Sequence, residues 1–149
     1  MIFVGIDPGA NGGIGVIFPS NSIAHAMKEF KTYSRLPHYL ESLGEVECFA
    51  LIEKVHAMPG QGVVSTFSFG YAFGVLEGCL IASGIPYDRV TPQKWQKEFG
   101  LYRLPDETKT AKKNRHKELA KELFPTLNIT HATADALLIA EYCRRQYDK

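Results

Sequence analysis

Three acidic residues stand at or inside apolar segments of this sequence, where a carboxylate needs compensation. Asp7 and Glu53 each end an apolar run, and Asp135 lies within the apolar segment 134–140. Burying an ionised carboxylate costs several kcal/mol unless a cation, hydrogen bonds or a turn satisfy it. Carboxylate oxygens are the ligands that Mg²⁺ prefers. Together the three acids predict a divalent-metal site.

The chemistry that such a site supports is phosphodiester hydrolysis. Two divalent cations about 3.5–4 Å apart serve this reaction, because one activates a water molecule and the other stabilises the leaving oxygen. No Ser-His-Asp or Cys-His arrangement competes clearly with this interpretation. Simpler interpretations stay open for single residues: Asp7 could stabilise a turn at Pro8-Gly9, and Asp135 could occupy the first turn of a helix.

The elements that would position these residues follow from the apolar patterning. Strands are predicted over residues 2–7, 13–18, 23–30, 48–55 and 87–91. Helices are predicted over residues 36–43, 67–83, 92–99 and 109–124, and from Thr130 or Thr133 to residue 147. The helix over 67–83 is apolar enough to be buried, and Gly70, Gly74 and Gly78 would give it a smooth stripe for close packing.

This order of elements predicts an α/β fold with a five-stranded mixed sheet flanked by helices, and it resembles the ribonuclease H-like arrangement. In that arrangement the first strand is central and the fourth lies parallel beside it. Asp7 and Glu53 would then end at the same edge of the sheet, one strand spacing (~5 Å) apart. Two carboxylates that close repel each other unless a cation lies between them.

Length and composition favour a single domain. The chain has 149 residues, of which 45% are hydrophobic, and this suits one compact core. Its net charge of +1 hides a segregation, because residues 89–121 hold ten of the 17 Lys and Arg but only four of the 16 acids. A basic segment of this kind predicts contact with a polyanion, although a solvated helix face has the same composition.

Neither secretion nor a membrane is indicated by the sequence. Cys48, Cys79 and Cys143 are odd in number, far apart and outside any zinc-binding spacing, so we expect buried, reduced thiols in an intracellular, cytoplasmic protein. No apolar run approaches the ~18 residues that a membrane span needs, and no basic segment precedes the N-terminal apolar residues.

Four segments of the chain together resemble the RuvC-type Holliday-junction resolvases, particularly the short phage-type members. They are, in order, Gly5-Ile6-Asp7-Pro8-Gly9, Ile52-Glu53-Lys54-Val55, Val90-Thr91-Pro92-Gln93-Lys94-Trp95 and Ala134-Asp135-Ala136-Leu137-Leu138-Ile139-Ala140. Each is a weak motif alone, but together and in this order they are specific, and they cover nearly the whole chain. The resemblance implies a homodimeric endonuclease that depends on Mg²⁺, with Mn²⁺ as a substitute, and nicks two opposed strands of a four-way DNA junction.

By this resemblance Asp7, Glu53 and Asp135 match the family's catalytic acids. Asp7 would bridge two cations, Glu53 would complete one, and Asp135 the other. The family's fourth ligand lies three residues before the last acid, where this sequence has Ala132. The nearest candidate is His131, four residues before Asp135 and on the same helical face. His131 could equally be a capping or surface residue.

The resemblance also places a lysine beside the scissile phosphate, a role that Lys112 or Lys113 suits. The family's aromatic residue three positions after the glutamate is His56 here, so we expect stacking on the junction core from another loop residue or from Phe67 or Phe69. Contacts to DNA phosphates, which carry little sequence information, are predicted for Lys94, Lys109, Lys112, Lys113, Arg115, His116 and Lys117.

Two other functions fit part of the same sequence. A different ribonuclease H-fold nuclease, acting on flaps, RNA or RNA–DNA hybrids, would keep the carboxylates and lose the junction preference. A non-catalytic protein would bind the junction without metal-dependent cleavage. Dimerisation follows from junction resolution, because two symmetric cuts need two active sites related by a twofold axis. The helix with the three glycines could supply the interface or pack internally.

Overall fold

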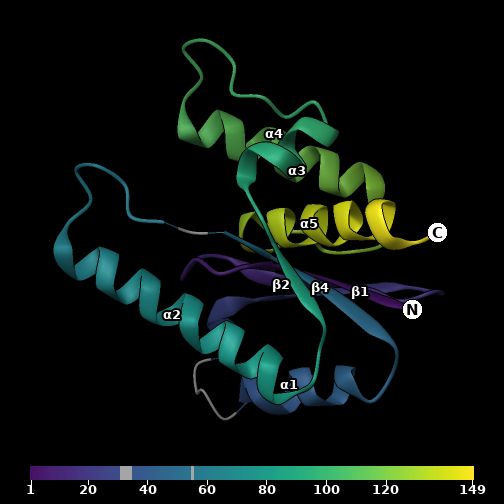
Figure 1. The fold of residues 1–149 in the computed structure, drawn as a ribbon. Helices are drawn as coiled ribbons and strands as arrows, with labels where there is room; N and C mark the ends of the chain where they lie inside the picture. Colours follow the sequence, from purple (N-terminus) through teal and green to yellow (C-terminus); the bar gives the residue numbers. More distant parts are fainter. Residues whose placement is uncertain (31–34, 55) are drawn as a thin grey trace.

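A five-stranded sheet lies between two layers of helices in the computed structural model, which describes residues 1–30, 35–54 and 56–149 (Figure 1). The sheet order is β3-β2-β1-β4-β5. β1 pairs antiparallel with β2, and β2 with β3, whereas β4 runs parallel to both β1 and β5. The predicted mixed sheet with a central first strand is confirmed. The strands are β1 (Ile2–Asp7), β2 (Gly13–Ile17), β3 (Ser22–Ala26), β4 (Cys48–Glu53) and β5 (Tyr87–Val90).

The parallel pairing of β1 with β4 brings two of the predicted acids to one edge of the sheet. Ile6 lies opposite Ile52 in this ladder, and both side chains are fully buried. Asp7 and Glu53 are the next residues of the two strands, so they leave the core side by side, as predicted. β4 ends at Glu53, Lys54 lies beyond the strand, and Val55, the predicted end, lies outside the described residues.

The third strand is shorter than predicted. β3 ends at Ala26, and a short 3₁₀ helix, η1 (Met27–Glu29), follows where the strand was expected to continue to Phe30. Glu29 accepts the backbone N–H of Ala26 at 3.0 Å and lies 3.0 Å from His25 Nδ1. These side-chain hydrogen bonds give the backbone an alternative to the sheet ladder, which ends the strand.

The helices divide between the two faces of the sheet (Figure 1). α5 begins directly after Thr130, so Asp135 lies in the second helical turn and the first-turn interpretation of this acid is wrong. The Thr108 hydroxyl caps α4 by accepting the backbone N–H of Ala111 at 3.0 Å. α1 (Arg35–Gly44) and α2 (Val63–Ala82) cover one face, and α3 (Pro92–Glu98), α4 (Lys109–Leu123) and α5 (His131–Tyr147) lie on the other.

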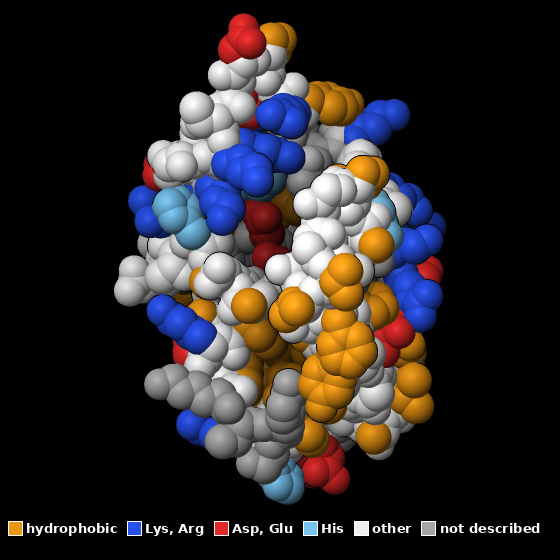
Figure 2. Space-filling model, turned by 90° about the vertical axis from the view of Figure 1, so that its left-hand side faces the viewer, with side chains coloured by type: hydrophobic (Ala, Val, Ile, Leu, Met, Phe, Trp, Pro, Cys, Tyr) orange, Lys and Arg blue, Asp and Glu red, His pale blue; other side chains and the backbone are white. Residues whose placement is uncertain are grey.

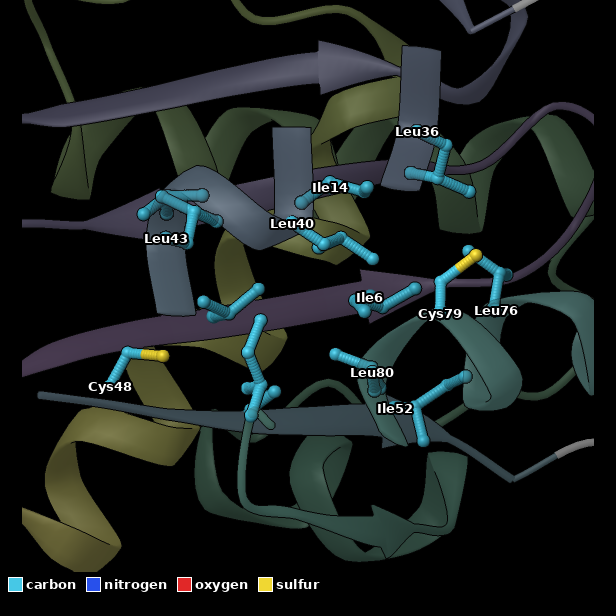
Figure 3. Close-up of a cluster of buried hydrophobic side chains, with 14 of the residues drawn as sticks. Ile6, Ile14, Leu36, Leu40, Leu43, Cys48, Ile52, Leu76, Cys79 and Leu80 are labelled. Atoms are coloured by element: carbon cyan, nitrogen blue, oxygen red, sulfur yellow. The ribbon is translucent and has the colours of Figure 1, made fainter. Parts of the chain in front are cut away.

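Two apolar cores hold these layers together, one on each face of the sheet. Figure 3 shows the first, where Ile6, Ile14 and Ile52 from the strands meet Leu40 of α1 and Leu80 of α2. The second core joins the opposite face to α3, α4 and α5 and is built around Trp95, Leu137, Leu138 and Ile139. All three cysteines are buried and unpaired, as predicted.

α2 differs most from its prediction. It begins at Val63, four residues before the predicted start, and only Leu76, Cys79 and Leu80 of this 20-residue helix are buried. Phe67 is 74% exposed and Val63 86% exposed. A Cβ atom placed on any glycine of its stripe, Gly70, Gly74 or Gly78, would have no atom within 4 Å. The expectation of a buried helix is therefore wrong, and the glycine stripe does not pack internally.

α2 also differs from the expectation that no segment of the chain is long and apolar enough to span a membrane. By length and composition alone, α2 is long and apolar enough to cross a membrane, with a mean hydropathy of 1.4 over its best window. Serine, threonine and glycine interrupt its apolar run, which hides this property from a search for uninterrupted apolar residues. Its C-terminal half packs against the sheet through Leu76 and Leu80, so the helix is part of the folded domain.

α5 lies directly on the backbone of the two central strands. A Cβ atom at Gly5 would stand 2.2 Å from both the carbonyl oxygen of Ala136 and the amide nitrogen of Ala140, and one at Gly15 would stand 2.8 Å from the Ala136 carbonyl group. Real Cβ atoms do not approach backbone atoms so closely, so these two strand positions accept only glycine. The small residues of α5 complete the contact.

We therefore expect Gly5→Ala to lower the free energy of unfolding by about 1–3 kcal/mol or more, because a rigid helix backbone must shift to admit one methyl group. Gly62→Ala is the matched control, since a methyl group there would meet no atom within 4 Å and its φ of −62° suits alanine, so we expect a change of at most about 1 kcal/mol. Denaturant unfolding followed by circular dichroism measures both variants. Equal stability of Gly5→Ala and wild type would contradict the close contact.

Candidate metal-dependent active site

Two of the three predicted acids, Asp7 and Asp135, line one hollow at the end of β1, and Glu53 ends the neighbouring strand β4. Asp7 ends β1, and its Oδ1 accepts the backbone N–H of Gly9 at 3.2 Å. Asp135 reaches the hollow from α5. In Figure 2 acidic side chains lie at the bottom of a depression, with Lys, Arg and His on one side and hydrophobic side chains on the other. This hollow has a volume of about 340 Å³ and is lined by Asp7, Gly9, Ala10, Asn11, Gly12, Phe69, Lys113, His131 and Asp135.

Burial and mutual repulsion make the ionised state of these acids costly. Burial, followed by the negative charge of Asp135, raises the pKa of Asp7 to about 6, against a smaller lowering by the Gly9 hydrogen bond and by Lys113. Burial, followed by the charge of Asp7, raises the pKa of Glu53 to about 8. A hydrogen bond from Trp95 and the charge of Lys112 oppose this rise. A divalent cation would relieve both effects.

Each of the three carboxylates has one oxygen bonded to the protein. Asp7 Oδ1 is bonded to Gly9, Glu53 Oε2 accepts the indole N–H of Trp95 at 2.7 Å, and Asp135 Oδ1 lies 2.7 Å from His116 Nδ1. The second oxygen of each has no hydrogen-bond partner within the described part of the chain. Three carboxylates with free oxygens and clustered charge fit a hard divalent cation.

These side chains do not yet enclose an ion as they stand. Across residues 1–30, 35–54 and 56–149, no three Asp, Glu, His or Cys side chains lie close enough together to hold a metal ion. Glu53 is held by a hydrogen bond from Trp95, and Asp135 lies within hydrogen-bond distance of His116. These side chains would have to move toward a shared cation, so the ligand assignment stays a prediction.

His131 lies in the hollow, although its ring is engaged elsewhere. It is the first residue of α5, one helical turn before Asp135 and on the same face. Its Nε2 lies 2.8 Å from Asn114 Oδ1 of α4. The structure therefore brings His131 to the site, while its role as a ligand stays a prediction.

The predicted DNA-contacting residues separate into different environments. Lys113 lines the hollow, and the charge of Lys112 acts on Glu53, so both lie near the acids, while their contact with DNA stays a prediction. Lys109 is exposed in the first turn of α4, and Lys117 lies on the same helix, half-buried. Lys94 lines a separate hollow beside β5.

Two residues of the basic helix have structural roles instead. His116 is 3% exposed, so the prediction that it contacts DNA phosphates is wrong. Arg115 forms an ion pair with Glu107 and donates a hydrogen bond to the carbonyl oxygen of Tyr102, which ties the loop before α4 to the helix. The pair lowers the pKa of Glu107 to about 2.

The two phenylalanines proposed for stacking differ in position. Phe69 is partly buried and lines the hollow, where its ring would lie 3.7 Å from a Cβ atom at Gly9. Phe67 is exposed on the outer face of α2. His56, at the position of the family's aromatic residue, is exposed in the loop that follows β4. Phe69 is thus the aromatic residue of this pair beside the acids.

Sequence reasoning missed the partners of two acids. Trp95 is fully buried, as an apolar residue of α3 would be, but its indole N–H also donates a hydrogen bond to Glu53. No spacing in the sequence indicates that bond, since 42 residues separate the partners. His116 could have been recognised as internal, because it precedes Ala120 by four residues on the buried face of α4.

Comparison with known proteins supports the fold. No family model and no curated protein matches this chain. The architecture is that of a ribonuclease H-like fold, and its structural neighbours are RuvC structures. RuvC from T. thermophilus in complex with a Holliday junction substrate has a TM-score of 0.63 and 18% sequence identity, covering 98% of this chain and 95% of that one. A second Thermus thermophilus RuvC structure has a TM-score of 0.58 and 14% identity, with 99% and 97% covered.

The raised pKa values predict how stability depends on pH. Asp7 and Glu53 hold protons in the folded protein up to about pH 6 and pH 8, whereas the unfolded chain releases them near pH 4. The folded state therefore binds more protons in this window, so stability falls as pH rises from about 4 to 8. We expect Glu53→Gln to reduce this loss of stability. At pH 8 its free energy of unfolding should exceed that of wild type by roughly 1–3 kcal/mol.

Urea unfolding at several pH values without divalent cations measures this dependence. Glu45→Gln serves as control, because Glu45 is exposed just before β4, at the opposite edge of the sheet, and its loss should leave the slope unchanged. The same slope of stability against pH in Glu53→Gln and in wild type would contradict the raised pKa of Glu53.

Proposed function

We propose that this protein is a metal-dependent, structure-selective DNA endonuclease that resolves four-way junctions by paired symmetric nicks. The observation that carries this proposal is the placement of Asp7 and Asp135, with Lys113, in one hollow at the end of a RuvC-like sheet, close enough to Glu53 for their charges to raise its pKa. Mg²⁺, or Mn²⁺ in its place, would supply an activated water and stabilise the leaving oxygen.

The chain's own residues supply the remaining requirements of hydrolysis. Water attacks phosphorus and the bond to the 3′ oxygen breaks, which leaves a 5′-phosphate and a 3′-hydroxyl that can be ligated. Lys113, and Lys112 behind it, offset the negative charge that accumulates on the scissile phosphate. The wall formed by Phe69 offers an aromatic surface for an unpaired base at the branch point.

Cleavage of an end-labelled four-way junction with Mg²⁺ or Mn²⁺ tests this function. We expect wild type to cut opposed strands of the junction and to spare matched duplex. Asp7→Asn should lose activity at least about a thousandfold, because it removes a central ligand charge. Glu45→Gln, which also removes one negative charge but lies at the opposite edge of the sheet, should cut like wild type.

Other outcomes of this assay separate the alternatives. Cleavage of flaps or RNA–DNA hybrids in preference to the junction would indicate another ribonuclease H-fold nuclease. Junction binding without cleavage in either metal would indicate a non-catalytic junction-binding protein and would contradict the proposed function.

A homodimer is part of the proposal, because paired cuts require two sites related by a twofold axis. The outer face of α2 carries exposed apolar side chains at helical spacing, including Val63, Phe67 and Ile81. Gly74 and Gly78 lie between them with open space above. Apolar side chains around a strip without side chains suit close packing against a second copy of the same helix.

Phe67→Asp tests this interface, because it places a charge on the exposed face without disturbing the core. We expect wild type to sediment as a dimer and Phe67→Asp as a folded monomer that no longer makes paired nicks. Tyr102→Asp, at an exposed position on the loop before α4, should remain dimeric. A monomeric wild type, or a dimeric Phe67→Asp, would contradict the interface, and binding of wild type to phospholipid vesicles would assign the face to lipid.

A further inference from the structure

Two buried aromatic rings contact two of the acids from the protein core. Trp95 of α3 is fully buried, and its indole N–H donates to Glu53 Oε2 at 2.7 Å. His116 of α4 is 3% exposed, and its Nδ1 lies 2.7 Å from Asp135 Oδ1. The two rings meet edge to face, with centroids 5.5 Å apart. Two separate helices thus each direct one nitrogen at one acid.

The chemistry of the partners fixes the direction of both hydrogen bonds. An indole nitrogen only donates, and an ionised carboxylate only accepts, so His116 Nδ1 carries the proton. The other ring nitrogen, Nε2, is buried without a hydrogen-bond partner among the described residues. The imidazole therefore directs its one satisfied polar atom at Asp135, which sets the orientation of that carboxylate.

Each bond engages one oxygen and leaves the other available. Glu53 Oε2 and Asp135 Oδ1 are bound from the core side, and the second oxygen of each has no partner in the part of the chain that the structure describes. Hydrogen bonds to ligating side chains commonly set their orientation in metal sites. A phenylalanine at 95 would fill the core without this bond.

We propose that Trp95 and His116 are positioning residues that orient Glu53 and Asp135 as divalent-cation ligands. This inference rests on the proposed function, because it concerns the residues that hold the metal ligands of the same site. Neither residue contacts substrate. Their effect passes through the two carboxylates that they hold.

Metal binding by the purified full-length chain tests the proposal independently of cleavage. Isothermal titration with Mn²⁺ should show about 10–100-fold weaker binding for Trp95→Phe and for His116→Leu than for wild type. His116→Asn should bind within about threefold of wild type, because its amide nitrogen lies as many bonds from the backbone as Nδ1 and restores the donor.

A packing control separates positioning from general loosening of the core. Leu101 belongs to the same apolar cluster as Trp95 and contributes no polar group to the acids. Leu101→Ala should lower stability without weakening Mn²⁺ binding. Equal weakening in Leu101→Ala and Trp95→Phe would overturn the proposal, as would wild-type Mn²⁺ affinity in both Trp95→Phe and His116→Leu.

The single tryptophan provides a spectroscopic readout. The one indole N–H signal in a ¹H–¹⁵N spectrum should move in Glu53→Gln and on addition of Mg²⁺, and Mn²⁺ should broaden it strongly. An indole signal that ignores both changes would overturn the contact. If instead wild type and Asp7→Asn bind Mn²⁺ equally, the metal site itself fails and the proposed function fails with it, whereas tight wild-type binding with unaffected variants overturns only the positioning role.

Discussion

The rest of the site depends on the direct contact between the backbone of α5 and the two central strands. No side chain separates them at Gly5 and Gly15, where even a Cβ atom would collide with the Ala136 carbonyl group. This close approach sets the height of α5 above the sheet, and with it the position of Asp135 relative to Asp7. A larger residue at Gly5 would move an acid of the site without replacing it.

Electrostatic strain is the second consequence of this arrangement. A helix so close to the sheet brings a third carboxylate toward two that already end neighbouring strands, so burial and like charge together raise the pKa values of Asp7 and Glu53. Lys112 and Lys113 lower them only in part. The fold thus holds negative charge where its own cations do not neutralise it, which is the condition under which a bound cation stabilises a site most.

The sequence predicted those parts of the fold that arise from local patterning. The hairpin of β1 and β2 follows from apolar runs and turn residues. The pairing of β4 with β1, which aligns Asp7 with Glu53, was expected from the resemblance of the element order to the ribonuclease H-like arrangement. The end of β3 at Ala26 depends on side-chain hydrogen bonds from Glu29 that no periodicity reveals. The bond between Trp95 and Glu53 joins residues 42 positions apart, and only the packed structure brings them together.

α2 shows why composition alone mispredicts burial. Its apolar content is that of a core helix, yet it touches the sheet through a short C-terminal stretch around Leu76 and Leu80, and its outer face stays open to solvent. An apolar composition indicates that a helix face favours burial, but it does not indicate whether the burying surface comes from the same chain or from another molecule. The homodimer proposed above would cover the exposed face of α2 with a second copy of the same helix. Such a pairing would also supply the twofold symmetry that the proposed paired cuts would require.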